Sequence, residues 1–209
     1  MAGALNAREA AKRETHEALL RAAMDEFAEK GLDLPSLDAI CARAGFTRGA
    51  FYVHFRDREE LVAAVMERVL DAVLDAVIGA EGAAHDLATT VARFVAVAAA
   101  GIEDVGRGPR AEGGVVPAGV PFHQILAACQ RDEPTRALMV RVLGRAARRL
   151  ADAAEADRQA RRVRDDVPPA ALAGLLVLLA LGVRAGADLR LPLDVAATRD
   201  AALRLLRPR

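Results

Sequence analysis

The sequence predicts an all-α protein, in which an N-terminal three-helix helix-turn-helix head precedes a larger helical body. Apolar residues make up 53% of the 209 residues, enough for a sizeable core. They are mostly Ala, Leu and Val, while aromatic residues are only 3% and Trp is absent. Ala and Leu favour helices, whereas strands favour β-branched and aromatic residues. We expect about nine or ten helices in two domains, residues 1–60 and residues 61–209.

Charge and cysteine content limit the classes of protein. The formal net charge is zero, so any contact with nucleic acid must come from a local patch. Cys41 and Cys129 are too few for a disulfide framework and suit a reducing cytosol. The N-terminus has no apolar run, and the longest one, residues 170–183, is shorter than the roughly 20 residues that cross a membrane. We therefore expect a cytoplasmic protein without a membrane span.

The first helix is expected to begin near Asn6, where Glu9 suits a capping box. It should end before Gly31, because a glycine after the last periodic residue is a common C-terminal stop. Its apolar residues recur at the spacing of one helix face, Leu19, Ala23 and Phe27.

Two short helices follow. Ser36 is a suitable N-cap for the first, which Gly45 ends. Thr47 is a suitable N-cap for the second, and Asp57 caps a further helix, with Glu60 at the reciprocal position, that runs to about residue 79. The first short helix carries the stripe Leu37, Ile40, Cys41 and Ala44, and the second should bury Phe51 and Phe55.

The body is expected to contain four or five more helices. A Gly/Pro-rich stretch over residues 106–121 predicts a loop. The expected helices cover about residues 87–104, 122–130, 134–162, 168–189 and 194–206.

Two short amphipathic helices joined by a tight glycine turn are typical of a helix-turn-helix, although an ordinary αα-hairpin has the same pattern. The second of them favours DNA binding, because no acid occurs from Thr47 to Arg56. Gly49 lets the backbone approach a partner closely. The polar face offers donors to phosphates and base edges, with Val53 beside them: Thr47, Arg48, Tyr52 and His54.

The head as a whole is slightly acidic. Residues 1–60 contain nine Lys and Arg against eleven Asp and Glu, so favourable electrostatics must be confined to one face. Arg8, Lys12 and Arg13 can supplement that face. We expect few phosphate contacts per subunit and a modest dependence of affinity on salt.

Several motifs occur in order at characteristic spacing: AAMDEFAEKG at residues 22–31, SLDAI at 36–40, AGFTRGAFYVHF at 44–55 and DREEL at 57–61. Over about residues 8–65 the chain closely resembles the TetR family of bacterial transcription regulators. The resemblance implies a DNA-binding head and a ligand-binding and dimerisation body. It also implies a homodimer on a palindromic operator of double-stranded DNA, usually a repressor released by a small apolar or amphipathic effector.

The resemblance also implies roles for individual residues. Ser36 matches the phosphate-contacting start of the second helix, and Arg58 stands where the family usually has a lysine that reaches phosphate. Val53 departs from an often aromatic position, and Arg56 and Asp57 depart from the usual residues at theirs, which alters the expected contacts. The recognition-helix positions are matched by Thr47, Arg48, Gly49, Tyr52, Val53 and His54.

The body helix after Pro168 and Pro169 is apolar on nearly all sides, which is typical of a buried helix. A second subunit is the natural cover in a body this small, and a central core helix in a monomer is the alternative. The expected interface stripe is Ala173, Leu176, Val177, Ala180 and Leu181. Residues 141–164 hold eight Arg, which form either a solvated face or, less favoured, a second nucleic-acid site.

An effector pocket would lie between the body helices, with an apolar lining and a few polar points. Plain core packing is the alternative for each candidate residue. His123 lies beside the Gly/Pro-rich loop and is the polar candidate. The full set of candidates is Phe94, Phe122, His123, Leu126 and Cys129.

An enzyme and a purely structural helical module are the rival classes. His16, His54, His85 and His123 are isolated, without metal-ligand spacing or a Gly-rich phosphate loop, so we expect no catalysis, metal or cofactor. The acid-free face of the third helix argues against a purely structural module.

Overall fold

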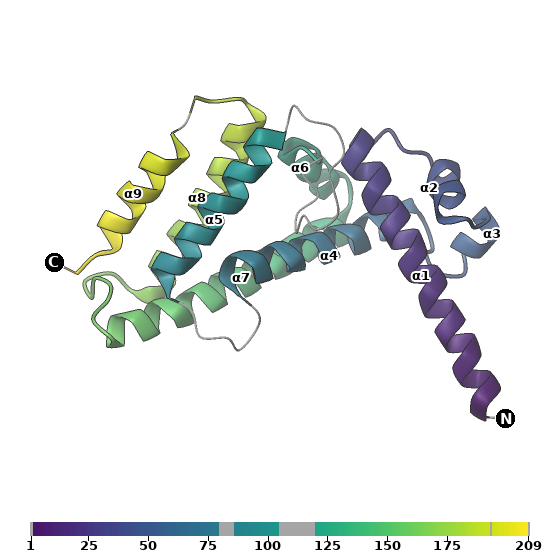
Figure 1. Ribbon diagram of the computed structural model, residues 1–209, viewed down its shortest axis with the longest axis horizontal. Helices are drawn as coiled ribbons and strands as arrows, with labels where there is room; N and C mark the ends of the chain where they lie inside the picture. The colour runs from purple at the N-terminus through teal and green to yellow at the C-terminus, as the bar shows by residue number, and fades with distance from the viewer. Residues whose placement is uncertain (1, 80–85, 105–119, 193, 209) are drawn as a thin grey trace. The chain divides into compact units, whose positions relative to one another are not determined.

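The computed structural model describes residues 2–79, 86–104, 120–192 and 194–208. This part of the chain forms nine α-helices and no strand, which confirms the predicted all-α class (Figure 1). The expected loop over residues 106–121 lies almost entirely outside the described residues. The helices are α1 (Ala2–Lys30), α2 (Leu37–Ala44), α3 (Arg48–Phe51), α4 (Arg58–Ile78), α5 (Leu87–Asp104), α6 (Phe122–Arg131), α7 (Glu133–Gln159), α8 (Pro169–Asp188) and α9 (Val195–Leu206).

The chain divides into two compact units. Unit 1 comprises Met1–Arg68 and Gly119–Arg136, and unit 2 comprises Val69–Ala118 and Ala137–Arg209. Unit 1 therefore contains α1 to α3, the first half of α4, and α6. The boundary expected at residue 60 falls in the first turn of α4, which runs without a break.

Helix α1 provides the main apolar face of unit 1. It begins at Ala2, so Asn6 lies inside the helix and is not its N-cap. The expected stripe of Leu19, Ala23 and Phe27 is buried, together with apolar residues of α2 and α3. Burying each large side chain contributes about 1.5–3 kcal/mol, so this core holds the three helices together. Figure 1 shows α2 and α3 beside one half of α1, while its N-terminal turns project beyond them.

The turns of unit 1 follow from local residue chemistry. Gly31 and Gly45 have φ of 78° and 76°, the left-handed conformation that glycine adopts without steric cost. Ser36 Oγ accepts a hydrogen bond from the backbone N–H three residues on at 3.1 Å, and Thr47 Oγ1 does the same at 3.3 Å. The predicted stops and caps of the helix-turn-helix are confirmed.

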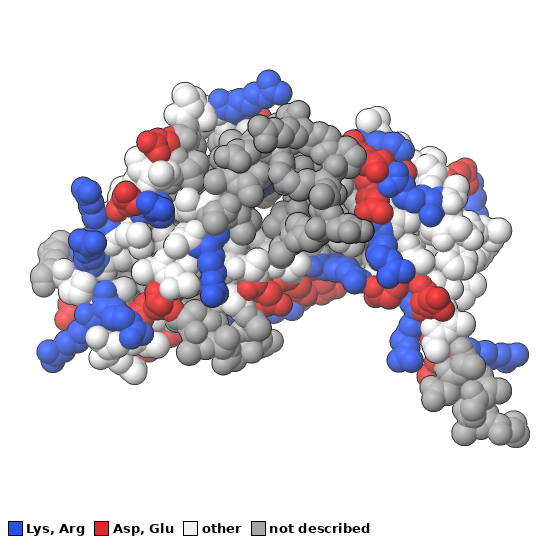
Figure 2. All heavy atoms as spheres, viewed as in Figure 1, with Lys and Arg blue, Asp and Glu red and all other residues white. Residues whose placement is uncertain are grey.

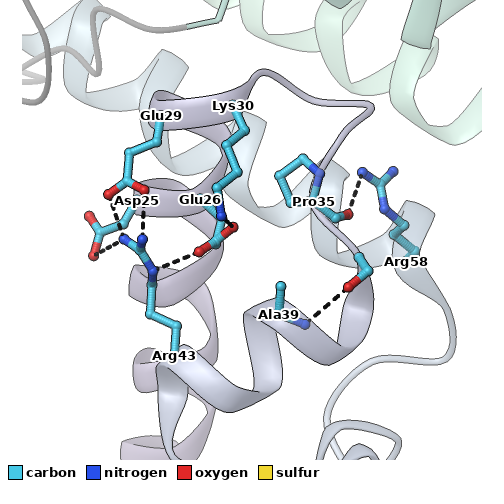
Figure 3. A network of polar contacts seen from close by, with 9 residues as sticks. Asp25, Glu26, Glu29, Lys30, Pro35, Ala39, Arg43 and Arg58 are labelled. Carbon is cyan, nitrogen blue, oxygen red and sulfur yellow. Dashed lines mark hydrogen bonds and ion pairs between the residues drawn. The ribbon is translucent and has the colours of Figure 1, made fainter.

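A buried carboxylate joins α1 to α2 (Figure 3). Glu26 is only 4% exposed, and a buried charge is costly unless it is paired. Lys30 Nζ lies 2.6 Å from this carboxylate, and Arg43 Nε lies 2.8 Å from it. Arg43 also donates two hydrogen bonds, of 2.8 and 2.6 Å, to Glu29. Asp25 lies 4.0 Å from the same guanidinium, so one arginine of α2 binds three carboxylates of α1.

Unit 2 has its own core, drawn from α4, α5, α7, α8 and α9. Asp157 is buried at the end of α7 and accepts a 2.8 Å hydrogen bond from the backbone N–H of Leu87. Arg162 Nε donates to the other oxygen of Asp157 at 2.7 Å. This carboxylate therefore fixes the start of α5 against α7. The core residues are Val77, Ile78, Leu87, Val91, Ala146, Leu150, Ala153, Ala154, Val163, Leu172, Ala173 and Leu206.

The arginines of residues 141–164 are largely neutralised within unit 2. Five of the eight form ion pairs with carboxylates of the same unit, which leaves little free positive charge for a second nucleic-acid site. The structure thus favours the solvated face. The pairs are Arg145–Asp71, Arg149–Asp75, Arg158–Glu155, Arg162–Asp157 and Arg164–Asp166.

Candidate nucleic-acid interface

Helix α3 has one buried and one exposed face, as the sequence predicts. Phe51 and Phe55 are 0% and 3% exposed, and their ring centroids lie 5.4 Å apart in the core of unit 1. Tyr52 and Val53 are 55% and 64% exposed. The Tyr52 ring stands edge-on to Phe51 at 5.3 Å, so the core fixes the base of the exposed phenol.

The exposed face collects most of the predicted contact residues. Thr47, Arg48 and Gly49 are exposed at the start of α3, and Tyr52 and Val53 follow at its end. A hydroxyl, a guanidinium and a phenol can donate hydrogen bonds to phosphates and base edges, and a valine methyl can contact a thymine methyl. The structure therefore brings these five residues together on one face without an acid among them.

Gly49 is not required by packing within the head. A Cβ built at this position meets only Thr47 Oγ1, at 3.7 Å, which is ordinary van der Waals contact. Its backbone does not have a positive φ, unlike that of Gly45. The absent side chain therefore leaves space on the exposed face, which suits close approach by a partner.

The arginines around α3 have partners within the head. Arg48 Nε lies 3.3 Å from Asp38 Oδ1 in an exposed pair. Arg56 donates a 2.8 Å hydrogen bond to Asp57, and this bond, followed by one from the backbone of Glu60, lowers the pKa of Asp57. Asp57 accepts from the Glu60 backbone at 2.8 Å, and the Glu60 carboxylate accepts from the Arg56 backbone at 2.7 Å. The expected capped start of α4 is confirmed.

Arg58 is bound by the loop between α1 and α2. Its guanidinium donates to the backbone carbonyl of Leu32. It also donates to that of Pro35 at 3.5 Å, as Figure 3 shows. It also lies over the Phe27 ring, 5.6 Å from the centroid. A phosphate bound by Arg58 would share a guanidinium that already stabilises the head. Ser36 lies exposed at the start of α2, where its hydroxyl caps the helix.

His54 contacts a residue that sequence reasoning did not connect with it. Its ring centroid lies 5.8 Å from that of His16 on α1, and His16 stacks on Phe55 at 4.7 Å. Burial lowers the pKa of His54, and the nearby His16 and Lys12 lower it further. The spacing of Lys12 and His16, one turn apart on α1, could have placed these two residues on one side of the helix. Their contact with His54 is a tertiary contact, which the sequence does not indicate.

The candidate pocket residues belong to different units. Phe94 lies on α5 of unit 2 and packs against its core. The other four lie on α6 of unit 1, where His123 and Leu126 are exposed and Phe122 and Cys129 are half-buried. Burial raises the pKa of the Cys129 thiol, so this free cysteine is protonated near neutral pH.

Helix α6 is bonded to the loop after α1. Gln124 Oε1 accepts a 2.8 Å hydrogen bond from the backbone N–H of Leu32, and Arg131 forms a 2.8 Å ion pair with Asp33. A Cβ at Gly31 would come within 2.7 Å of Gln124 Oε1. The helix that carries four candidate pocket residues therefore contacts the end of α1 directly.

The predicted interface stripe on α8 lies partly inside unit 2. Ala173 is buried, and Leu176 and Val177 pack against the unit 2 core. Ala180 and Leu181 are half-buried. The exposed large apolar side chains of this helix are instead Leu175 and Leu178.

By length and composition alone, helix α8 is long and apolar enough to cross a membrane, with a mean hydropathy of 2.0 over its most apolar window. Only 22% of that window is buried in the chain. Unit 2 therefore leaves apolar surface on this helix uncovered, and that surface needs a cover. Across the described ranges, no group of three or more His, Cys, Asp and Glu residues is placed to hold a metal ion.

A helix-turn-helix with an exposed, acid-free polar face defines the head as a DNA-binding domain. Residues 19–65 match the family model of bacterial regulatory proteins, tetR family. The head therefore carries the DNA-binding domain of the tetR family of bacterial regulators. It is 42% identical over 55 residues to the HTH-type transcriptional repressor BepR of Brucella suis, covering 26% of each chain. The match spans about a quarter of the length of such curated relatives.

Solved structures show that the likeness in fold extends through the body. GusR of Salmonella enterica superposes with a TM-score of 0.66 at 20% identity, covering 92% of this chain and 95% of that one. SmeT, the repressor of the Stenotrophomonas maltophilia multidrug efflux pump SmeDEF, gives 0.58 at 26% identity, covering 91% and 88%. SmeT in complex with triclosan gives 0.64 at 24% identity, with the same two coverages.

Proposed function

We propose that the protein is a homodimeric transcription repressor of the cytoplasm that leaves a palindromic DNA operator when a small molecule binds. The exposed face of α3 carries this proposal. Thr47, Arg48, Gly49, Tyr52 and Val53 offer donors, a methyl contact and backbone access on a rigid base. BepR and SmeT are both described as repressors, which supports the same direction of control here.

The DNA-binding step is tested by selecting duplexes from a random library with the purified protein. The selected operator then serves as the probe for fluorescence anisotropy. Arg48→Ala and Tyr52→Ala should each weaken binding at least about fivefold, since a good base contact contributes about 1–3 kcal/mol. Arg21→Ala is the matched control, because Arg21 is exposed on α1, apart from the α3 face. Unchanged affinity in both α3 variants would refute this interface.

The dimer is supported by the uncovered apolar surface of α8. Leu175 and Leu178 are 59% and 67% exposed in the isolated chain, and a second copy of α8 provides an apolar cover of the same kind. Two heads are also needed, because one head presents a small contact face and a slightly acidic overall charge. Leu176, Val177 and Ala180 would then support this surface from the inner side.

The test of the dimer is Leu178→Glu, measured by light scattering after size-exclusion chromatography. The variant should be monomeric and should bind the operator poorly. Leu205→Glu is the control, because Leu205 on α9 is 64% exposed and is not in the proposed interface. A dimer that persists in Leu178→Glu and Leu175→Glu would contradict this interface, and membrane association of the wild-type chain would point to another cover for α8.

Effector release is supported by the contacts of α6. Phe122, Leu126 and Cys129 share one helix face, and Gln124 of the same helix holds the backbone of Leu32. A ligand that moves α6 would therefore act on the end of α1, to which α2 is fixed through Arg43. The complex of SmeT with triclosan makes apolar and amphipathic molecules the first class to try.

The effector test is a thermal-shift screen of apolar and amphipathic small molecules, triclosan among them. A true effector should raise the melting temperature and weaken operator binding, and operator DNA should weaken its binding by the same factor. His123→Ala should change the ligand concentration that releases DNA while leaving DNA affinity without ligand unchanged. The opposite result would remove His123 from the pocket.

A further inference from the structure

An acidic side chain lies beside the exposed face of α3. Asp38, in the first turn of α2, forms an ion pair with Arg48, the first residue of α3. The two side chains are 68% and 56% exposed. Figure 2 shows mostly uncharged surface over α2 and α3, with acidic and basic side chains meeting at its edge. An exposed pair contributes little to stability, and a carboxylate near DNA repels phosphates, so the pair needs another explanation.

The backbones that carry this pair are both fixed. Ser36 caps α2 two residues before Asp38, and Thr47 caps α3 one residue before Arg48. Gly45 lies between the two helices and adopts the left-handed conformation that joins them in a tight turn. The carboxylate is therefore presented to the guanidinium from a fixed position.

The ion pair engages one edge of the guanidinium. Arg48 Nε lies 3.3 Å from Asp38 Oδ1, and within the described ranges no hydrogen bond occupies the two terminal amino groups of Arg48. Such amino groups form the fork that binds O6 and N7 of guanine in the major groove. A carboxylate that holds Nε restricts the rotation of a long side chain, so less entropy is lost when the fork binds a base.

We propose that Asp38 is a positioning residue for base recognition: it holds Arg48 by Nε, so that the terminal amino groups of Arg48 select a guanine in each half of the operator. This inference rests on the proposed function of the head. Asp38 itself touches no base. Its negative charge lowers the affinity for every sequence, while its hold on Arg48 raises the discrimination in favour of guanine.

The test replaces one nitrogen atom of the DNA. In the selected operator, each guanine is replaced in turn by 7-deazaguanine, which lacks the N7 acceptor but still pairs with cytosine. The ratio of the affinities for the two duplexes measures the recognition of N7. At one guanine the replacement should cost the wild-type protein about two- to tenfold, the value of one hydrogen bond, and should cost Arg48→Ala nothing.

Variants of Asp38 are then compared at that guanine. Asp38→Ala should bring the ratio most of the way to that of Arg48→Ala, whereas Asp38→Asn keeps an oxygen at the same place and should retain more of it. In an Arg48→Ala background, Asp38→Ala should change the ratio no further. Asp25→Ala is the matched control and should keep the wild-type ratio, because Asp25 is a 66% exposed acid of the same unit that lies beside Arg43.

A wild-type ratio in Asp38→Ala would overturn this inference and leave the proposed function intact. Equal ratios in Asp38→Ala and Asp38→Asn, or no guanine at which the wild type and Arg48→Ala differ, would also overturn it. Failure of the wild-type protein to select any duplex would instead refute the proposed function. Thermal unfolding should be similar in the two Asp38 variants, because both remove the same charge from the first turn of α2.

Discussion

The imidazole ring of His16 lies 5.8 Å from that of His54 and thereby joins α1 to the turn that follows α3. Burial and the neighbouring groups lower the pKa of His54, so a proton on this ring is less favourable in the folded head than in the unfolded chain. The groups that face His54 from α1 are His16 and Lys12, both of which oppose a further positive charge.

Acid should destabilise the head through His54. Burial first, and then His16 and Lys12, lower its folded-state pKa below the ordinary value of 6.5, so the unfolded chain takes up the proton first. The contribution of neutral His54 to the free energy of unfolding is therefore fully present above pH 6.5. It is lost as the pH falls from 6.5 through the folded-state pKa. Urea unfolding between pH 8 and pH 5 measures this loss.

His54→Gln is the matched variant for the acid effect. Its stability should fall less than that of the wild type over the same pH range, because one titrating group is gone. His16→Phe keeps a ring against Phe55. Its acid-induced loss of stability should lie between those of the wild type and His54→Gln. Identical pH dependence in the wild type and His54→Gln would contradict the assigned role.

Gly49→Ala should separate binding from folding. The added Cβ meets only Thr47 Oγ1 at 3.7 Å, and alanine favours a helix over glycine by up to about 1 kcal/mol. The fold should thus be unchanged or slightly more stable, while operator affinity falls. Chemical denaturation and fluorescence anisotropy measure the two quantities.

Gly45→Ala should behave in the opposite way. Gly45 has φ of 76°, which costs an L-residue about 1–2 kcal/mol. Stability should therefore fall, with DNA binding lost only as far as unfolding accounts for it. A Gly49→Ala protein that binds the operator as well as the wild type would show that close backbone approach is not needed.

Arg43→Ala should destabilise unit 1 more than the loss of an exposed ion pair does, because it leaves the buried Glu26 with Lys30 as its remaining cation. Arg68→Ala breaks the exposed pair with Glu17 and should cost no more than about 1 kcal/mol. Both values come from urea unfolding at pH 7. Equal costs for the two variants would mean that burial of Glu26 does not matter.

Asp38→Asn should strengthen operator binding. It frees Arg48 from an exposed pair and removes a negative charge beside the α3 face. Exposed pairs contribute about 0.2–1 kcal/mol, so the gain in affinity should be at most about fivefold and should shrink at high salt. Asp75→Asn breaks a comparable pair in unit 2 and should leave affinity unchanged. A loss of affinity in Asp38→Asn would contradict the assignment of Arg48 to DNA.

Features governed by local rules were predictable from the sequence. The burial of Phe51 and Phe55 follows from their spacing, and the ends of α1 and α2 follow from glycines that adopt a left-handed conformation. The predicted start of α1 was wrong by about one turn, because α1 already begins at Ala2. The residues before Asn6 contain no signal strong enough to keep them out of the helix. A capping sequence such as Asn6 and Glu9 favours a helix start but does not force one, so a helix can continue through it.

Long-range contacts were not predictable. The bond from Leu32 to Gln124 joins residues 92 positions apart, and no local pattern marks it. The partners of Arg43 and Arg58 depend in the same way on how α1, α2 and α4 meet. On α8 the difficulty is different, because a helix that is apolar on all sides has no periodicity to separate the inner Ala173 from the outer Leu178.

The place of α6 in unit 1 limits how this head can be exchanged between proteins. A fragment cut at Arg68 would lose the side chain that accepts the Leu32 N–H and the partner of Asp33. A chimaera could keep residues 1–68 and take its body from another protein. The new body would then need, at the position of Gln124, a side chain that fits against Gly31. The head is thus a discontinuous module, and a functional graft has to carry both of its segments.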